Sequence, residues 1–219
     1  MLLRAAAFIA LMLPGACGDG AQANAGAAAE APGPRGWEIG PVIRGRNHSR
    51  GAAPRPSPGP GGGWHIDLPR APGSVHYVTF RHGPLAGRSR IVMRYRVEAD
   101  RGVRIAPATV PGAPSIITLY FQRRGDDWSA RGRFEAYRWY ATFASHSPIA
   151  SGEHEMVAPL DADWTAVLTS SARGDPAAFR AALADADRVG FVLGGGDGYG
   201  HGVFATGRAR LIVTDFRVE

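Results

Sequence analysis

The sequence contains no lysine, so all 25 of its basic side chains are arginines. Against 19 acidic residues they give a formal net charge of +6 and a pI near 10.2. A GC-rich genome favours Arg, Ala, Gly and Pro codons, so this bias does not by itself specify an anionic partner. No basic helix or aromatic-basic recognition pattern stands out, and we expect no nucleic-acid partner. An acidic polysaccharide or a lipid head group is the better candidate for any functional part of the charge.

Cysteine is almost absent, and the single one, Cys17, follows a short apolar segment behind one positive charge. Arg4 precedes the apolar residues Ala5 to Leu13, and small residues then lead to the cysteine, which is the order of an export signal. Residues 1–17 are therefore predicted to be an export signal. We expect the protein to leave the cytoplasm.

The run Leu13-Pro14-Gly15-Ala16-Cys17 resembles the lipobox of bacterial lipoproteins, although Leu13 lies one place further back than in that motif. The resemblance implies that Cys17 is diacylated and becomes the mature N-terminus of a periplasmic or outer-membrane-anchored lipoprotein. The alternative is cleavage after Ala21-Gln22-Ala23, which removes the cysteine. In both cases no thiol is left for a disulfide, a thiolate metal site or a cysteine nucleophile.

Long hydrophobic runs are also lacking. No other apolar segment reaches the roughly 18 residues that a membrane-spanning helix needs, so we expect membrane contact only through an N-terminal lipid. Residues 18–36 are rich in Ala, Gly and Pro and are predicted to form a disordered tether. The remaining residues, 37–219, suffice for a single β-sandwich domain with a full core.

Short segments of alternating apolar and polar residues dominate this domain, separated by Gly, Pro and Asp. Trp37 to Ile43 is predicted to be a strand, followed by a long loop from Ala52 to Gly63 that lies inside the domain. The later predicted strands are Trp64–Leu68, Val75–Phe80, Arg90–Glu98, Ser115–Arg123, Phe134–Phe143, Glu153–Val157, Trp164–Leu168, Arg188–Leu193, Gly202–Thr206 and Ala209–Val218.

One helix interrupts the strands. Asp175 supplies an N-cap and Pro176 the first helical position, and Phe179 and Leu183 keep helical spacing to about Asp185. The predicted fold class is all-β: a jelly-roll-like antiparallel β-sandwich with one short helix.

The densest cluster of aromatic and planar polar side chains lies in two neighbouring predicted strands and the loop between them. We expect these strands to place Tyr120 and Gln122 beside Arg138 and Tyr140 on one exposed face. Sugar rings stack on aromatic side chains, and their hydroxyls bond to Arg, Asp and Gln. The candidate ligand-binding residues are Tyr120, Gln122, Arg124, Trp128, Arg138 and Tyr140. The alternative is that the tryptophans are core and that the arginines are solvated.

The glycine-rich run from Gly194 to Gly202 lacks the Lys-Ser/Thr pair of a phosphate-binding loop and is predicted to be a hairpin tip. The alternative is that its side chains Asp197, Tyr199 and His201 line a pocket rim or a calcium site. Oxygen ligands this close together also occur in ordinary turns, so the sequence leaves both interpretations open. No other cofactor is expected.

Motifs for catalysis are missing. There is no Gly-x-Ser-x-Gly elbow, and His154-Glu155 lacks the second histidine of a zincin. Four carboxylates are candidates for a glycosidase pair, but the sequence does not give their separations. They are Glu98, Asp126, Asp127 and Glu135.

From Trp64 to Glu219 the order of strands, the short helix and the glycine-rich connection resembles the jelly-roll domains of the carbohydrate-binding-module and galactose-binding-like kind. The resemblance implies a sandwich that binds glycans, in some cases beside calcium. The expected function is an exported, non-catalytic envelope protein that binds a polysaccharide or another surface glycan. The alternatives are a polysaccharide lyase or glycoside hydrolase on the same fold and a structural lipoprotein with a protein partner.

Overall fold

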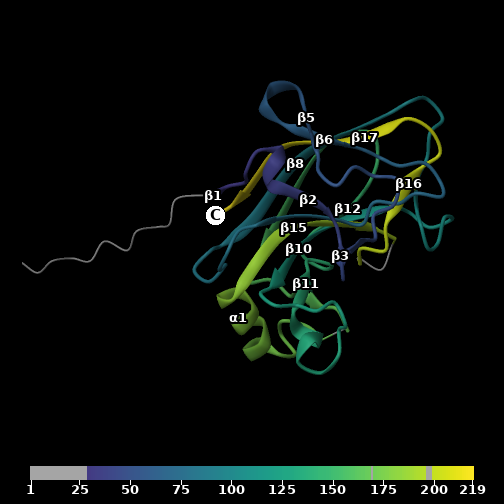
Figure 1. The fold of residues 1–219 in the computed structure, drawn as a ribbon. Helices are drawn as coiled ribbons and strands as arrows, with labels where there is room; N and C mark the ends of the chain where they lie inside the picture. Colours follow the sequence, from purple (N-terminus) through teal and green to yellow (C-terminus); the bar gives the residue numbers. More distant parts are fainter. Residues whose placement is uncertain (1–28, 169, 196–198) are drawn as a thin grey trace, which may run out of the picture.

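The computed structural model describes residues 29–219 apart from 169 and 196–198, and it is an antiparallel β-sandwich with one α-helix, as predicted (Figure 1). The predicted export signal, residues 1–17 with Cys17, lies outside the described residues. No helix among the described residues is long and apolar enough to cross a membrane.

The first sheet has six strands, and its main path runs β13-β8-β17-β6-β5, with β1 paired to β17. Its strands are β1 (Ala29–Glu30), β5 (Ser57–Pro58), β6 (Trp64–Asp67), β8 (Arg90–Ala99), β13 (Gly152–Pro159) and β17 (Ala209–Val218).

The second sheet has seven strands, and its main path runs β14-β11-β10-β15-β7-β2, with β12 paired to β10. Its strands are β2 (Trp37–Gly40), β7 (Tyr77–Arg81), β10 (Ile116–Arg123), β11 (Arg138–Tyr140), β12 (His146–Pro148), β14 (Thr165–Ala166) and β15 (Ala186–Gly194). Two short ribbons complete the fold: β3 (Val42–Ile43) with β4 (Arg46–Asn47), and β9 (Ile105–Pro107) with β16 (Val203–Ala205).

The core lies between the two sheets, because alternate residues of each strand point inward. In β8 the apolar residues are buried, while Arg94 and Arg96 point outward and pair with Glu155 and Glu153 of β13. Trp37 of β2 bridges the sheets and lies 4.6 Å from the ring of Trp64 in β6. The charged outer face of the six-stranded sheet is thus a ladder of solvated ion pairs, each worth little to stability.

The helix α1 (Pro176–Ala184) forms where the cap residues predicted it. Asp175 accepts a hydrogen bond from the backbone N–H of Ala178 at 3.0 Å, and Phe179 packs 4.9 Å from the ring of Trp139. The helix therefore closes the end of the core beside β10, β11 and β15 (Figure 1).

Several details of the fold go beyond the sequence prediction or differ from it. The segment 134–143 is not one strand, because Gly132–Ala136 forms a 3-10 helix and only Arg138–Tyr140 pairs as β11. The centre of the predicted hairpin tip, residues 196–198, lies outside the described residues; β15 before it belongs to the seven-stranded sheet, and β16 after it pairs with β9. Residues 29–36 were expected in the tether, but Ala29 and Glu30 pair with the C-terminal end of β17. The boundary thus lies earlier than composition suggested.

Candidate functional site

The candidate ligand-binding residues lie on the outer face of the seven-stranded sheet. Backbone pairing places Tyr120 opposite Tyr140 and Gln122 opposite Arg138, which confirms the predicted register. The same pairing extends across β15, β7 and β2. One row across this face is Glu38, Thr79, Gly190, Tyr120 and Tyr140, and the next is Arg81, Arg188, Gln122 and Arg138.

The prediction that this face is exposed at Tyr120, Gln122, Arg138 and Tyr140 is wrong. Tyr120 and Tyr140 are 0% exposed, Arg138 is 4% exposed and Gln122 is 5% exposed. The reason is that loops fold back over β10 and β11 and cover their outer side.

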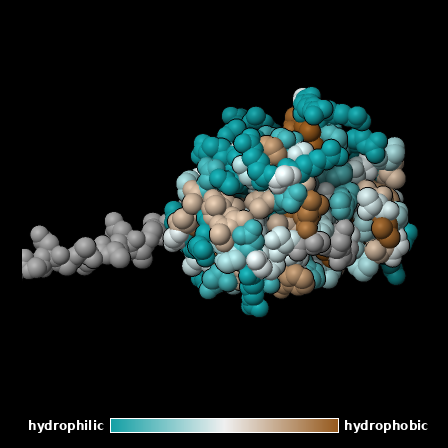
Figure 2. Space-filling model, turned by 90° about the horizontal axis from the view of Figure 1, so that it is seen from below, coloured by the Kyte–Doolittle hydropathy of each residue, from teal (hydrophilic) through white to brown (hydrophobic). Residues whose placement is uncertain are grey.

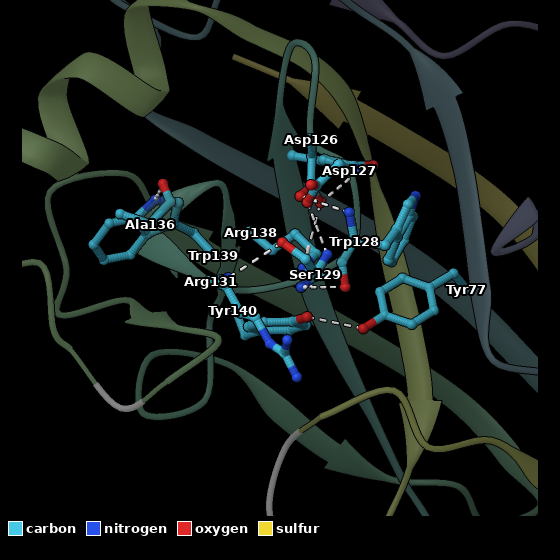
Figure 3. Close-up of polar contacts among 11 residues, drawn as sticks. Tyr77, Asp126, Asp127, Trp128, Ser129, Arg131, Ala136, Arg138, Trp139 and Tyr140 are labelled. Atoms are coloured by element: carbon cyan, nitrogen blue, oxygen red, sulfur yellow. Dashed lines mark hydrogen bonds and ion pairs between the residues drawn. The ribbon is translucent and has the colours of Figure 1, made fainter. Parts of the chain in front are cut away.

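The covered side chains form a small second core. Tyr77, Tyr120, Tyr140 and Val192 are its buried members, and Trp128 packs on it from the loop. The hydroxyls of Tyr77 and Tyr140 lie 2.8 Å apart, and these two residues point toward each other in Figure 3. Burial raises the pKa of both Tyr120 and Tyr140 well above the ordinary value. Both phenols are therefore neutral and serve as packing, not as bases.

The loop that carries Trp128 is built by two successive aspartates. Asp126 accepts a hydrogen bond from the backbone N–H of Trp128 at 3.1 Å, and Asp127 accepts one from that of Ser129 at 2.8 Å. Such side-chain bonds to the backbone two residues on are the usual way in which Asp stabilises a turn. Trp128 itself has a left-handed φ of 67°, and its ring lies 5.1 Å from that of Tyr77.

Arg138 and Asp126 form a buried ion pair beneath this loop (Figure 3). Arg138 Nε lies 3.4 Å from Asp126 Oδ2, and the guanidinium lies 4.8 Å from the centre of the Trp128 ring. The side chain of Asp126 is 0% exposed, and Gln122 Nε2 donates to it at 2.8 Å. Burial raises the pKa of Asp126, while Arg138 and the hydrogen bonds from Trp128 and Gln122 oppose that rise. Arg138 thus holds the loop through charge and through its stacking on Trp128.

A pocket of about 210 Å³ lies beside this loop, over β2, β7, β15 and β10. Tyr77, Thr79 and Gln122 line it from the sheet, and Trp128 lines it from the loop. Three arginines and three carboxylates among the lining residues balance in charge: Arg81, Arg123 and Arg188 with Glu38, Asp126 and Asp187. The pocket therefore combines aromatic rings with hydrogen-bonding groups and has no formal net charge.

One lining residue has an unused acceptor. Gln122 Oε1 is buried and has no hydrogen-bond partner among the described residues. An unsatisfied buried acceptor costs about 1–3 kcal/mol. A ligand that donates a hydrogen bond to this oxygen would recover that free energy.

The structure divides the six predicted site residues into three groups. Gln122 and Trp128 line the pocket. Tyr120, Arg138 and Tyr140 lie behind it in the covered cluster. Arg124 lies outside the lining and faces Asp185, with its Nε 3.4 Å from Oδ1.

Several lining residues were not predicted from the sequence. Glu38, Thr79, Arg81, Asp187 and Arg188 come from β2, β7 and β15, which are far from β10 in sequence. Their only sequence signal is that polar side chains alternate with apolar ones. That signal is equally typical of a solvated strand face.

The candidate glycosidase carboxylates do not gather at one place. Asp126 lines the pocket, but Glu98 lies in β8 of the other sheet, and Glu135 accepts a hydrogen bond from the backbone of Gly132 in its own 3-10 helix. No group of three His, Cys, Asp or Glu side chains among the described residues is arranged to hold a metal ion. Asp197, of the suggested calcium ligands, lies outside the described residues.

No protein-family model and no curated protein matches the chain. Among solved structures, one match comes from a study of prominent members of the human gut microbiota that express endo-acting O-glycanases to initiate mucin breakdown. It covers 83% of this chain and 90% of that chain, with 11% sequence identity and a TM-score of 0.42. At these values the similarity assigns neither a family nor a function.

Proposed function

We propose that the protein is an exported envelope protein that binds a polysaccharide or another surface glycan in the pocket beside Trp128, without catalysing a reaction. The observation that carries the proposal is the buried amide oxygen of Gln122, which lacks a partner and belongs to a residue that lines a polar pocket. The aromatic rings of Tyr77 and Trp128 lie at the same pocket.

These groups match the chemistry of a sugar. A pyranose presents C–H faces that pack on aromatic rings and hydroxyls that donate to amide and carboxylate oxygens. The volume of about 210 Å³ is below the ~300–1,000 Å³ of pockets for drug-sized ligands, which fits a single ring of a longer chain.

Gln122→Met is expected to weaken glycan binding at least about tenfold, because it removes the acceptor and keeps the length of the side chain. Its fold should survive with a loss of about 1.5–3 kcal/mol, the contribution of a hydrogen bond to a charged group such as Asp126. A glycan array on the full chain identifies the ligand, and calorimetric titration then compares the variant with the unchanged protein.

Arg124→Ala is the matched control, because Arg124 is exposed and lies outside the pocket lining. It should bind the same glycan as the unchanged protein does. If Gln122→Met binds equally well, the pocket is not the glycan site.

The export part of the proposal rests on the order of charge, apolar run and small residues before Cys17. We expect protein isolated from its native host to begin at Cys17 with attached lipid. Mass spectrometry of the N-terminal peptide measures this. A start after Ala23 without lipid would leave export intact and refute lipidation, and an intact Met1 would refute both.

A glycoside hydrolase on the same fold is the second candidate, and one observation favours it. Asp126 is a carboxylate with a raised pKa at a pocket, which is the property of a general acid. Both of its oxygens are already engaged, with Trp128 N–H on one and with Gln122 and Arg138 on the other. The test is whether the protein releases reducing ends from the glycan that it binds. Release by the unchanged protein that is lost in Asp126→Asn would establish a glycoside hydrolase in place of a non-catalytic binding protein.

A structural lipoprotein with a protein partner is less well supported by the surface. On the face seen in Figure 2, hydrophilic residues predominate and the strongly hydrophobic residues lie in separate spots. Among residues 29–219, as far as the structure describes them, the exposed large apolar residues are Val42, Val110, Phe143 and Leu168. A large contiguous apolar patch, which would mark a protein interface, is not formed by these strongly hydrophobic spots on that face.

A further inference from the structure

The hairpin formed by β3 and β4 carries arginines that have no acidic partner. From Ile39 to Ile66 the sequence contains four arginines and no Asp or Glu. Arg44, Arg46 and Arg50 are exposed, and none of them pairs with a carboxylate among the described residues. The outer face of the six-stranded sheet differs, since its arginines are matched by carboxylates across the strands. The hairpin is therefore a local excess of positive charge.

A histidine from another segment lies beside this excess. Ser49 and Arg50 are bonded to the start of β7: Ser74 N–H donates to the Arg50 carbonyl at 2.8 Å, and His76 N–H donates to Ser49 Oγ at 2.9 Å. Nδ1 of the His76 ring lies 3.2 Å from the carbonyl oxygen of Gly200. Three segments distant in sequence thus meet at one place.

The charges at this place are cationic. Burial lowers the pKa of His76, and the charges of His201, His48 and Arg50 lower it further. The ring of His76 is therefore neutral at pH 7, and the attraction for an anion comes from the exposed arginines beside it. We call the exposed groups Arg44, Arg46, His48 and Arg50 the basic surface.

The basic surface is continuous with the pocket. Gly40, Pro41 and Val42 line the pocket and lead directly into the hairpin. His48 N–H donates to the carbonyl of Pro41 at 2.9 Å, which fixes the hairpin against that wall. A chain molecule with one unit in the pocket and further units along Val42 would continue onto the hairpin that carries these arginines.

Building on the function proposed above, we infer that the glycan is acidic: one ring lies in the pocket, and carboxylate or sulfate groups of neighbouring units contact the basic surface. Arginine pairs with both oxyanions in a bidentate manner. The pocket itself has no formal net charge and is lined by groups that suit hydroxyls, which favours a sugar polymer over a lipid head group with its acyl chains.

The test compares two triple variants of the full chain that remove the same charge. Arg44→Gln, Arg46→Gln and Arg50→Gln neutralise the hairpin. Arg101→Gln, Arg173→Gln and Arg180→Gln neutralise three exposed arginines elsewhere and serve as the control. Titrations use polygalacturonate for carboxylates, heparin for sulfates and dextran as a neutral polymer, each at low and at high salt.

We expect at least a tenfold loss of affinity for polygalacturonate or heparin in the hairpin variant and less than a twofold loss in the control. Added salt should weaken the binding of acidic polymers by the unchanged protein. The difference in affinity between the unchanged protein and the hairpin variant should then become smaller. The polymer that responds identifies the oxyanion.

Three outcomes would overturn the inference. An equal loss in both variants would assign binding to overall charge. A preference for dextran or another neutral glycan that the hairpin variant leaves unchanged would show that the ligand is not acidic, while Gln122→Met would still test the pocket. Tighter binding to phosphatidylglycerol vesicles than to either acidic polymer, lost in the hairpin variant, would assign the basic surface to a membrane. Loss of glycan binding in Gln122→Met but not in the hairpin variant would support the pocket as the glycan site and refute the contact with the basic surface.

Discussion

Arg138→Ala is expected to reduce the free energy of unfolding by about 3–5 kcal/mol, because it leaves the buried carboxylate of Asp126 without its charge partner. The guanidinium also packs on the Trp128 ring, so the loop loses a second contact. Urea denaturation of the variant and the unchanged protein measures the difference. A loss of this size is a large part of the 5–15 kcal/mol that stabilises an ordinary domain.

The matched control is the double variant Arg138→Ala with Asp126→Asn, which removes the stranded charge. It should recover at least about 1 kcal/mol relative to Arg138→Ala alone. An Arg138→Ala protein as stable as the unchanged one would mean that the carboxylate reaches water and that the loop is not fixed by the pair.

The effect of Arg138→Ala should depend on pH in a definite direction. The pKa of Asp126 is already raised above 3.8 by burial, and the loss of Arg138 raises it further, because Arg138 opposes the shift. A carboxyl whose pKa is higher in the folded state than in the unfolded state stabilises the fold fully at pH values below its unfolded pKa. This stabilisation is lost as the pH rises through its folded pKa. The defect should therefore be smallest near pH 3.8 and below, and full at neutral pH.

Gly190→Ala is expected to cost about 3 kcal/mol or more, or to prevent folding. A Cβ at this position would lie well inside the van der Waals distance of the Val78 carbonyl oxygen and 2.9 Å from Thr79 Cα. Both are backbone atoms of the neighbouring strand β7, so no side chain can turn away. The substitution would force β15 and β7 apart in the middle of the seven-stranded sheet, and thermal unfolding followed by circular dichroism measures the result.

Gly112→Ala is the control for this substitution. A Cβ there meets nothing within 4 Å, and the position has no left-handed φ. We expect its melting temperature to stay within a few degrees of the unchanged protein. Equal behaviour of the two variants would show that β15 and β7 tolerate separation and that the sheet floor of the pocket is not rigid.

Together these substitutions test how the pocket is built. The floor depends on close packing of β7 and β15, and the wall at Trp128 depends on Arg138 and Asp126. Arg138 and Tyr140 are both buried, so their replacement would lower the stability of the fold. A change in binding in these variants would therefore not be separable from a loss of stability. Gln122 and the basic surface are the places where binding is expected to change without loss of the fold.

Local patterns in the sequence determined the elements of this protein. Alternation predicted β8 and the inward face of β10, and Asp175 with Pro176 predicted the start of α1. The pairing of Tyr120 with Tyr140 was also predicted, because β10 and β11 are joined by one loop and their register follows from short-range connection. The prediction of a strand over 134–143 was wrong in its first part, because Gly132–Ala136 forms a 3-10 helix. The alternation of apolar and polar residues does not indicate such a helix.

Only the tertiary structure decided what covers the face and what lines the pocket. Alternation states that Tyr120 and Tyr140 share a side of the sheet, but it is silent on whether water or another segment meets that side. The loop with Trp128 folds over them, and Asp126 binds Arg138 beneath it, so the predicted exposed surface became a second core. The pocket forms beside it because β2, β7 and β15, from distant parts of the chain, bring Glu38, Thr79 and Arg188 next to Gln122. Such long-range pairing depends on the packing of the whole chain, and no local pattern encodes it.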